Sequence, residues 1–306
     1  MKKEYVQYNL LKRLCLAVAS LLVFSGCIKD NINYCTYPSI RVVAVAPVGA
    51  DPIDPHDVQQ VVFYVFDQNE KFIDKFTAPL NVCVRLNYPD ERNLYVVGLA
   101  NVDDASVLVS RLCPGAPMSD GLVSLKQLHD YLSQPIYASA SDLFLGEMCI
   151  TNSLTSEKTF DLPMKRMVAG VNVKIRGLKE FAHTSDEDFR VVVSTDHNAF
   201  DFYGNLFGAN TNYLPGGMFL SHTPSRYETS GFNIIAEPKG PPITIKIYHG
   251  NKLIDTINAD SDGNLLTARN GWILEVRIDY IGSVKVTIIN AQWGVESVWK
   301  DFGATE

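Results

Sequence analysis

The sequence has no hydrophobic segment long enough to cross a membrane as a helix. The longest one, Leu14 to Phe24, has 11 residues, whereas a membrane-spanning helix needs about 20. Basic residues are also in the minority, because 27 Lys and Arg stand against 34 Asp and Glu, for a net charge of −7. A charge of this sign argues against a nucleic-acid partner and against a basic patch that binds membrane surfaces.

The common motifs of enzymes are absent too. The chain has no His-Glu-x-x-His metal site, no Gly-x-Ser-x-Gly nucleophile turn and no glycine-rich phosphate loop. Its 6 histidines are scattered, and none has a second titratable group at a repeated ligand spacing. We therefore predict that the protein is not an enzyme and that it has no catalytic residue, no cofactor and no metal site.

One segment copies part of a calcium-binding loop. Asn258, Asp260, Asp262 and Gly263 have the spacing of the first half of an EF-hand, in which alternate oxygen ligands converge on the cation. The twelfth position, where a bidentate glutamate is needed, is Arg269. A polar turn between two strands explains the same residues, and we favour that interpretation.

The amino terminus has the parts of a bacterial lipoprotein signal peptide. Basic residues precede the hydrophobic segment, and the small pair Ser25-Gly26 comes immediately before Cys27. This pattern is typical of cleavage before the cysteine and acylation of its thiol. We predict a signal peptide over residues 1–26 and a lipid on Cys27; secretion with an unmodified Cys27 is the alternative. The mature chain then has 280 residues and a charge of −10.

Cysteine is scarce in the mature chain. Besides Cys27, four cysteines remain after removal of the signal peptide, and all lie in its first half: Cys35, Cys83, Cys113 and Cys149. Export permits disulfides, and four cysteines allow three pairings. Disulfides among these residues are therefore possible, and free thiols are the alternative.

Many short segments of the mature chain alternate apolar and polar residues. Turn residues separate these segments at intervals of roughly 8–12 residues, which is typical of antiparallel β-sandwiches. We predict an all-β protein of two sandwiches, over residues 27–160 and 161–306, that meet near residues 158–165. The residues expected in the cores are Val62, Phe63, Val65, Val171, Val173, Ile245, Leu274 and Val276.

Two segments depart from this alternation. Ser124 and Gln127 form a capping box before an apolar stripe of helical spacing that Pro135 ends, so we predict a short helix there. Asp196 to Tyr227 is expected to be a long loop. Its aromatic residues either pack as core or contact a protein or sugar partner; they are Phe200, Phe202, Tyr203, Phe207, Tyr213 and Phe219.

Several segments, in this order, resemble the fimbrillin-associated anchor family of Bacteroidetes type V fimbriae. They are Cys27 with Asp30 and Cys35, then residues 61–67, 94–101, 142–146 and 162–173, and finally Ile288, Ile289 and Trp293. The resemblance implies two transthyretin-like sandwiches and a position at the base of a fimbria, on the outer membrane. It also implies a fimbrial stalk subunit as partner.

The function that these observations predict is that of a lipid-anchored structural subunit. It would attach a fimbria to the cell outer membrane, seat the first subunit and limit fimbria length. The carboxy-terminal tail either offers the partner a strand, with Val295, Trp299 and Phe302 as contacts, or pairs with its own sandwich as an ordinary last strand. The alternatives are a stalk or tip subunit, or a glycan-binding surface adhesin that is also a lipoprotein.

Overall fold

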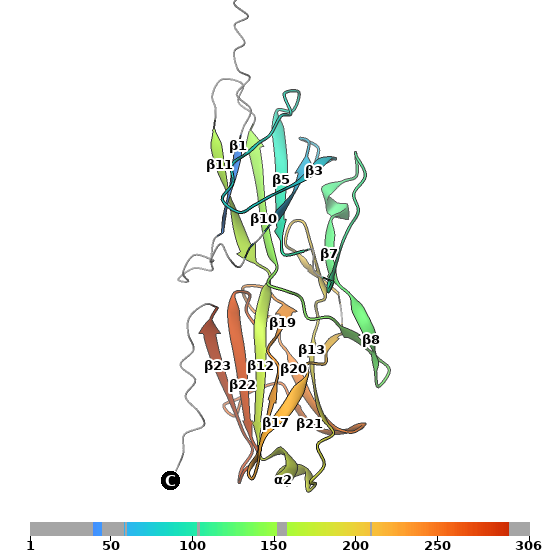
Figure 1. Ribbon diagram of the computed structural model, residues 1–306, viewed down its shortest axis with the longest axis vertical. Helices are drawn as coiled ribbons and strands as arrows, with labels where there is room; N and C mark the ends of the chain where they lie inside the picture. Colours follow the sequence, from blue (N-terminus) through green and yellow to red (C-terminus); the bar gives the residue numbers. More distant parts are fainter. Residues whose placement is uncertain are drawn as a thin grey trace, which may run out of the picture.

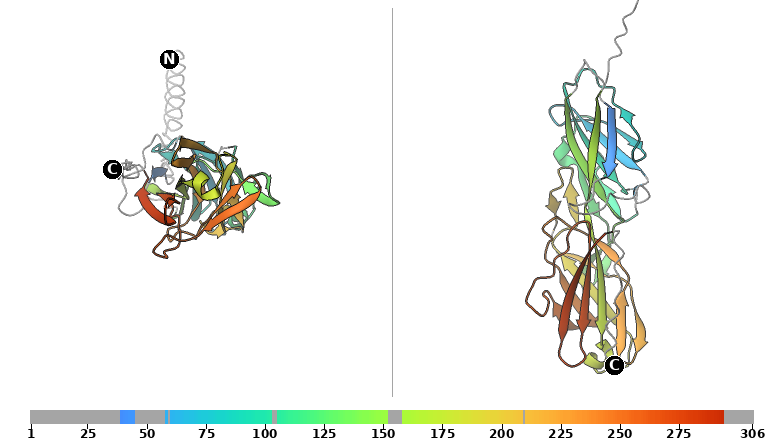
Figure 2. Two further views of the ribbon diagram at one scale, coloured as in Figure 1. Left: turned by 90° about the horizontal axis from the view of Figure 1, so that it is seen from below. Right: turned by 90° about the vertical axis from the view of Figure 1, so that its left-hand side faces the viewer.

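The computed structural model describes residues 39–44, 58, 60–102, 105–151, 158–208 and 210–293. Their strands form four sheets in two halves, which are stacked end to end along the long axis of the molecule (Figures 1 and 2). The predicted all-β, sandwich-like fold is therefore confirmed. Within the described residues, no helix has the length and apolarity needed to span a bilayer.

The first half contains a seven-stranded sheet. In spatial order its strands are β3 (Phe72–Ala78), β2 (Val61–Phe66), β5 (Asn93–Ala100), β10 (Phe144–Thr151), β11 (Thr159–Arg166), β1 (Ser39–Ala44) and β4 (Val84–Arg85). Every residue of the inner strand β2 is buried, so both faces of this sheet are covered there. An uninterrupted run of Val, Phe and Tyr is what a strand buried on both faces requires.

A small four-stranded sheet covers one of those two faces. Its strands are β15 (Leu206–Phe207), β14 (Ala199–Asp201), β7 (Leu122–Leu125) and β6 (Val107–Val109). Val62 and Tyr64 of the large sheet join the same core as Phe200 and Phe202 from β14 and the turn after it. The opposite face, with Phe63 at its centre, has a separate core of its own.

The second half consists of two six-stranded sheets. In the first, β19 (Phe232–Ile235) pairs with β12 beside a path of β17 (Gly217–His222), β18 (Ser225–Thr229), β12 (Val168–Arg176), β22 (Trp272–Asp279) and β23 (Lys285–Gln292). The second has the order β21 (Lys252–Ile257), β20 (Thr244–His249), β13 (Phe189–Thr195), β16 (Thr211–Tyr213), β9 (Gln134–Tyr137) and β8 (Gln127–Tyr131). The α-helix α2 (Leu178–Ala182) follows β12, and a 3-10 turn, η2 (Met118–Asp120), precedes β7.

Short strands are exchanged between the two halves. β14 and β15, from the second half of the sequence, lie beside β7 in the first, with Phe200 opposite Val123. In return β9 pairs with β16, where Asn212 lies opposite Ile136. One hydrophobic core therefore runs through both halves. β11 spans the predicted joint at 158–165, and the division into domains at residue 160 stays a prediction.

The predicted helix after Ser124 is wrong, because this segment forms the end of β7 and the hairpin of β8 and β9. Leu132 and Ser133 make the hairpin turn with positive φ angles of 49° and 62°, the backbone of a type I′ turn. That turn normally carries Asn-Gly, so nothing in the sequence indicated it. Leu128, placed on the apolar face of the helix, is 60% exposed.

The predicted loop from Asp196 to Tyr227 is also wrong, because it contains β14 to β17 and most of β18. Phe200, Phe202 and Tyr213 are buried, whereas Phe207 is exposed. The open question about these aromatic residues is thus answered for most of them, since they pack as core. All the core residues named from the sequence are buried, which confirms that part of the prediction: Val62, Phe63, Val65, Val171, Val173, Ile245, Leu274 and Val276.

Candidate functional site: the first strand and the junction

The first strand of the described chain is an integral part of the large sheet. β1 pairs in parallel with β11 over six residue pairs, from Ser39 opposite Thr159 to Ala44 opposite Met164. On its other side it pairs antiparallel with the two residues of β4. The backbone of β1 is therefore hydrogen-bonded on both sides. Pulling this strand out would open two ladders at once.

Most of the residues for which the sequence predicts a function lie outside the described residues. These are Cys27, Cys35 and the tail residues Val295, Trp299 and Phe302. Their roles stay predictions. Cys83, Cys113 and Cys149 are exposed free thiols, so no two of them are paired. Cys35 itself lies outside the described residues.

Between β11 and β12 the chain passes from the first half to the second within a single residue. β11 ends at Arg166 and β12 begins at Val168, which leaves only Met167 between two sheets. Met167 donates its backbone N–H to the Leu143 carbonyl at 2.8 Å and accepts one from Ala236 at 3.0 Å. The crossing is therefore fixed by backbone hydrogen bonds to both halves, rather than left as an open linker.

Arg166 lies at the centre of this junction and is only 4% exposed. Its Nε and Nη2 each donate to one carboxylate oxygen of Asp142, at 2.5 Å. Its guanidinium carbon lies 4.9 Å from the ring centroid of Phe144 and 4.6 Å from that of Trp293. A guanidinium close to two aromatic rings and bound by a bidentate carboxylate has the contacts that arginine favours.

Trp293 connects this cluster to the end of the last strand. Its backbone N–H donates to the Gly271 carbonyl at 3.1 Å, and Gly271 in turn donates to the Val168 carbonyl at 2.9 Å. Asn270 donates its side-chain amide to the Arg166 carbonyl at 2.8 Å. The last described strand, β23, thus ends at the junction between the two halves (Figure 1).

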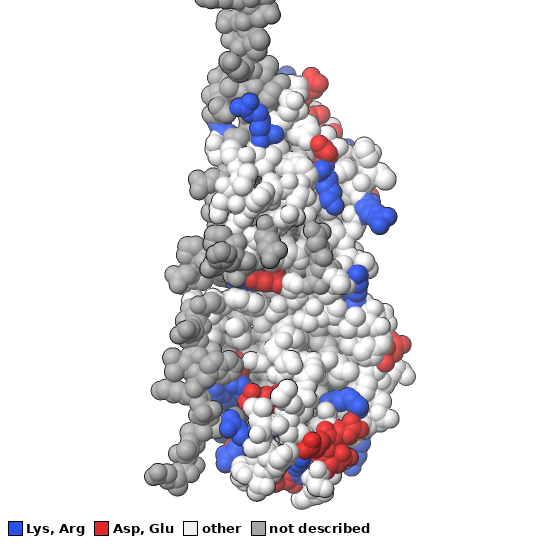
Figure 3. All heavy atoms as spheres, in the orientation of Figure 1, with Lys and Arg blue, Asp and Glu red and all other residues white. Residues whose placement is uncertain are grey.

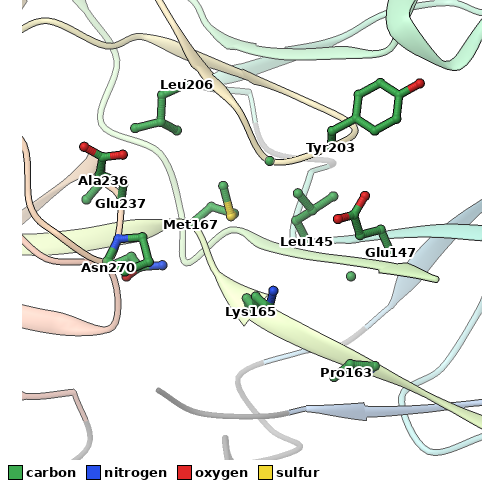
Figure 4. A pocket seen from close by; sticks show the side chains of 13 residues that line it. Leu145, Glu147, Pro163, Lys165, Met167, Tyr203, Leu206, Ala236, Glu237 and Asn270 are labelled. Carbon is green, nitrogen blue, oxygen red and sulfur yellow. The ribbon is translucent and has the colours of Figure 1, made fainter. Parts of the chain in front are cut away.

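A pocket of 230 Å³ lies beside the junction (Figure 4). Leu145, Met167 and Leu206 form its apolar part, and Glu147, Lys165 and Glu237 supply charged groups. Burial raises the pKa of Glu147, a shift that Lys165 opposes and Asp201 adds to. On the same side of the pocket, burial and a hydrogen bond to Glu70 raise the pKa of Tyr203, whose hydroxyl donates to that carboxylate at 2.5 Å.

Nothing in this pocket indicates a reaction centre. It holds no cysteine, serine or histidine beside a base, which nucleophilic catalysis requires. Within the part of the chain that the structure describes, no group of three or more His, Cys, Asp or Glu could hold a metal ion. The arrangement is one that packs two halves together and leaves a shallow mixed pocket between them.

The calcium-like segment is a turn that its own residues satisfy. The Asp260 carboxylate accepts hydrogen bonds from the backbone N–H groups of Asp262 and Asn264, at 2.9 and 2.8 Å. The Asn264 side-chain amide donates a third at 2.9 Å. These bonds lower the pKa of Asp260, with the Asn264 side chain as the largest cause. The geometry agrees with the polar-turn interpretation.

Charged side chains gather at the far end of the second half, near α2. On the face shown in Figure 3, acidic and basic groups are mixed there. Lys179 pairs with Glu187 at 2.7 Å, and the His249 ring nitrogen lies 3.1 Å from Asp186. The carboxylates of both pairs are exposed, and ion pairs at such a surface contribute little, about 0–1 kcal/mol each.

Solved structures with a similar fold come from Porphyromonas and Bacteroides species. The fimbrial anchor protein Mfa2 of Porphyromonas gingivalis matches with a TM-score of 0.60 at 11% identity, over 84% of this chain and 97% of that one. A candidate polysaccharide-binding protein from Bacteroides thetaiotaomicron gives a TM-score of 0.62 at 14% identity, over 84% and 96%. An adhesin candidate from that species gives 0.59 at 14% identity, over 84% and 97%.

At these identities the structural matches establish a shared fold. A search of curated proteins found no match. The family model, in contrast, matches residues 37–299, almost the whole mature chain that the sequence predicts, and it describes fimbrillin-A associated anchor proteins. This family consists of structural proteins rather than enzymes, which confirms the prediction of a non-enzymatic protein. The chain therefore belongs to the family of the fimbrillin-A associated anchor proteins Mfa1 and Mfa2.

Proposed function

We propose that this fimbrial anchor protein is tethered to the cell outer membrane by a lipid on Cys27 and seats the first stalk subunit on the cell surface. The lipoprotein signal over residues 1–26 supports the tether. Family membership supports the fimbrial role. By fixing the base of the fimbria, the protein also limits fimbria length.

The observation that carries the proposal is the place of β1. Ser39 lies 12 residues after Cys27, and the strand that it begins is paired on both sides within the large sheet. A stalk subunit of this type loses its first strand by proteolysis, whereas this protein would lose its lipid with that strand. A retained β1 therefore passes load from the membrane directly into the folded body.

The junction supports the same role, because an anchor must transmit tension along its length. The load passes from β11 through Met167 into β12. Backbone hydrogen bonds from both halves brace this crossing, and the buried Arg166 with its carboxylate and two rings surrounds it. Strand exchange between the halves adds a second connection. With these connections, the two halves would move together as one rigid body.

The tail, residues 294–306, is the segment that we propose binds the stalk subunit. It starts at the junction beside Trp293, and an extended segment there can add to the open sheet edge of another protein. In an extended tail, Val295 and Trp299 lie on one face and would fill alternate pockets of the partner, whereas Phe302 lies on the other face. The alternative is a tail that completes the sheets of its own chain.

Deletion of residues 295–306 tests this role of the tail. The variant keeps Trp293 and therefore the Arg166 cluster, so we expect a folded, membrane-bound protein whose fimbriae detach into the medium. Immunoblots of the cell and medium fractions measure how much of the anchor protein stays with the cells and how much fimbrial protein is released. Loss of the protein itself would instead favour a tail that completes its own fold, and fimbriae that stay on the cells would refute the proposed contact.

A further inference from the structure

A second cavity, unrelated to the junction, lies on the sheet that contains the exchanged hairpin. It has a volume of 570 Å³ and is lined by residues of β9, β16, β13 and β20 and of the segments next to them. No motif in the sequence pointed to it, because four separate segments contribute to it. We refer to it as the polar cleft.

The polar cleft exists because this sheet curls. β8 and β20 are four strand spacings apart in the sheet order, which amounts to about 19 Å in a flat sheet. Yet the rings of Tyr131 from β8 and Tyr248 from β20 lie 5.7 Å apart, edge to face. The Tyr131 hydroxyl also donates to the Gly250 carbonyl at 3.0 Å. The hairpin thus folds back towards β20 and hollows the face between them.

The strand register places polar side chains in rows on this face. Ser194 of β13 lies opposite Asn212 of β16 on one side and Thr244 of β20 on the other. Two residues earlier on β13, Val192 lies on the same face, opposite Lys246 of β20. Val192 is 2% exposed but belongs to neither hydrophobic core, which agrees with its lying beneath the folded hairpin.

Two of these polar groups are fixed in advance by the framework. The Ser194 hydroxyl donates to the Asn212 side-chain oxygen at 2.7 Å. The Asn212 side-chain nitrogen donates in turn to the carbonyls of Pro135 and Asn210, at 3.2 and 3.1 Å. Because its proton is already committed, the Ser194 oxygen is left to accept hydrogen bonds. A ligand with hydroxyl donors suits it.

The lining excludes several classes of ligand. β9, β16, β13 and β20 are paired with one another through their backbones, so a peptide strand finds no open edge here. Among the described residues, Lys246 is the one basic residue that lines the cleft, whereas phosphate groups are usually held by several cations or backbone N–H groups. The apolar residues in the described part of the lining are prolines alone, which disfavours lipids and most cofactors.

The hydrogen-bonding groups that remain are hydroxyls, amides, one carboxylate and one ammonium. Gln134, Asp196 and Thr244 offer acceptors or donors around the fixed Ser194 and Asn212, and the single charges of Asp196 and Lys246 balance. We propose that the polar cleft binds a neutral oligosaccharide, whose many hydroxyls match such a lining. This proposal does not depend on the fimbrial role or on the tether.

Binding is tested with the full-length protein extracted in detergent and applied to an array of oligosaccharides. The array carries neutral mucin-type glycans, their sialylated counterparts and neutral fragments of bacterial surface polysaccharides, which separates host from bacterial sources. We expect binding to a neutral member of either source. Binding to no neutral glycan, or to sialylated glycans alone, would overturn the proposal.

Two substitutions then place the ligand in the cleft. Thr244→Val and Lys246→Ala should each weaken binding about fivefold or more, the factor that one lost hydrogen bond of about 1 kcal/mol gives. Valine keeps the branched shape of Thr244, so the melting temperature should hold. Lys252→Ala, on the exposed strand β21, is the matched control and should bind like the native protein. Unchanged binding by both cleft variants would place the glycan elsewhere and refute the site.

Discussion

Cys27→Ala is expected to release the protein from the outer membrane into the soluble fraction. The acyl chains of a lipoprotein stabilise attachment by about 0.8 kcal/mol per buried CH₂ group. The mature chain has a charge of −10, so electrostatic attraction to anionic lipids cannot replace them. We therefore expect the membrane-bound share to fall about tenfold or more, measured by fractionation and immunoblotting.

Cys113→Ala is the matched control for this experiment. Cys113 is an exposed free thiol in the described part of the chain, and its loss should leave the protein in the membrane fraction. A Cys27→Ala variant that still sediments with membranes after a high-salt wash would show that something other than lipid holds the protein there. That result would reject the lipoprotein interpretation.

Arg166→Met is expected to destabilise the junction by about 3–5 kcal/mol, because it removes the bidentate arginine from the largely buried Asp142 carboxylate. It also removes the cation that contacts the rings of Phe144 and Trp293. Thermal unfolding of the full-length protein measures the loss, at about 2–4 °C per kcal/mol for a chain of this size. Limited proteolysis should then cut near Met167, which the native protein protects.

Arg190→Met provides the control, since Arg190 forms a comparable pair with Asp188 at 3.0 Å but is 40% exposed. Exposed pairs contribute about 0–1 kcal/mol, so this variant should melt close to the native protein. Arg166→Lys should rescue little, because lysine cannot form the bidentate pair. If Arg166→Met melts together with Arg190→Met, the junction is not held by this cluster.

The strands that could be predicted are those whose own residues alternate between apolar and polar. β12, β20 and β22 alternate over six to nine residues, and the inward residues of each, such as Val173, Ile245 and Val276, are buried. In such strands the burial of one face decides the register locally. The sequence then needs no knowledge of the partner strand to predict the element.

The exchanged strands could not be predicted in this way. β14, β15 and β16 have two or three residues each, which is too short for any period to appear. They form because strands of distant segments lie beside them, as Val123 lies opposite Phe200. In the β8–β9 hairpin the spacing of Leu125, Leu128 and Leu132 imitated a helix, and long-range pairing with β16 overrode that local preference.

The functional residues differ in the same way: some are predicted from a local sequence pattern, whereas others are brought together only by the fold. The lipid site at Cys27 is predicted from a linear motif, and the family from segments in a fixed order. The Arg166 cluster joins Asp142 and Phe144 of one segment with Trp293 of another, so only the fold brings it together. The polar cleft is likewise assembled from four strands, and residues of ordinary type such as Ser194 and Thr244 gave no signal in the sequence.

The central claim is that this protein holds fimbriae on the cell, and their distribution between cells and medium tests it most directly. A strain without the gene would be supplied with either the native gene or the Cys27→Ala variant. We predict that the native protein keeps fimbriae on the cells, whereas the variant sheds them into the medium and leaves them longer in electron micrographs. Fimbriae that stay on the cells equally in both strains, at equal length, would contradict the account.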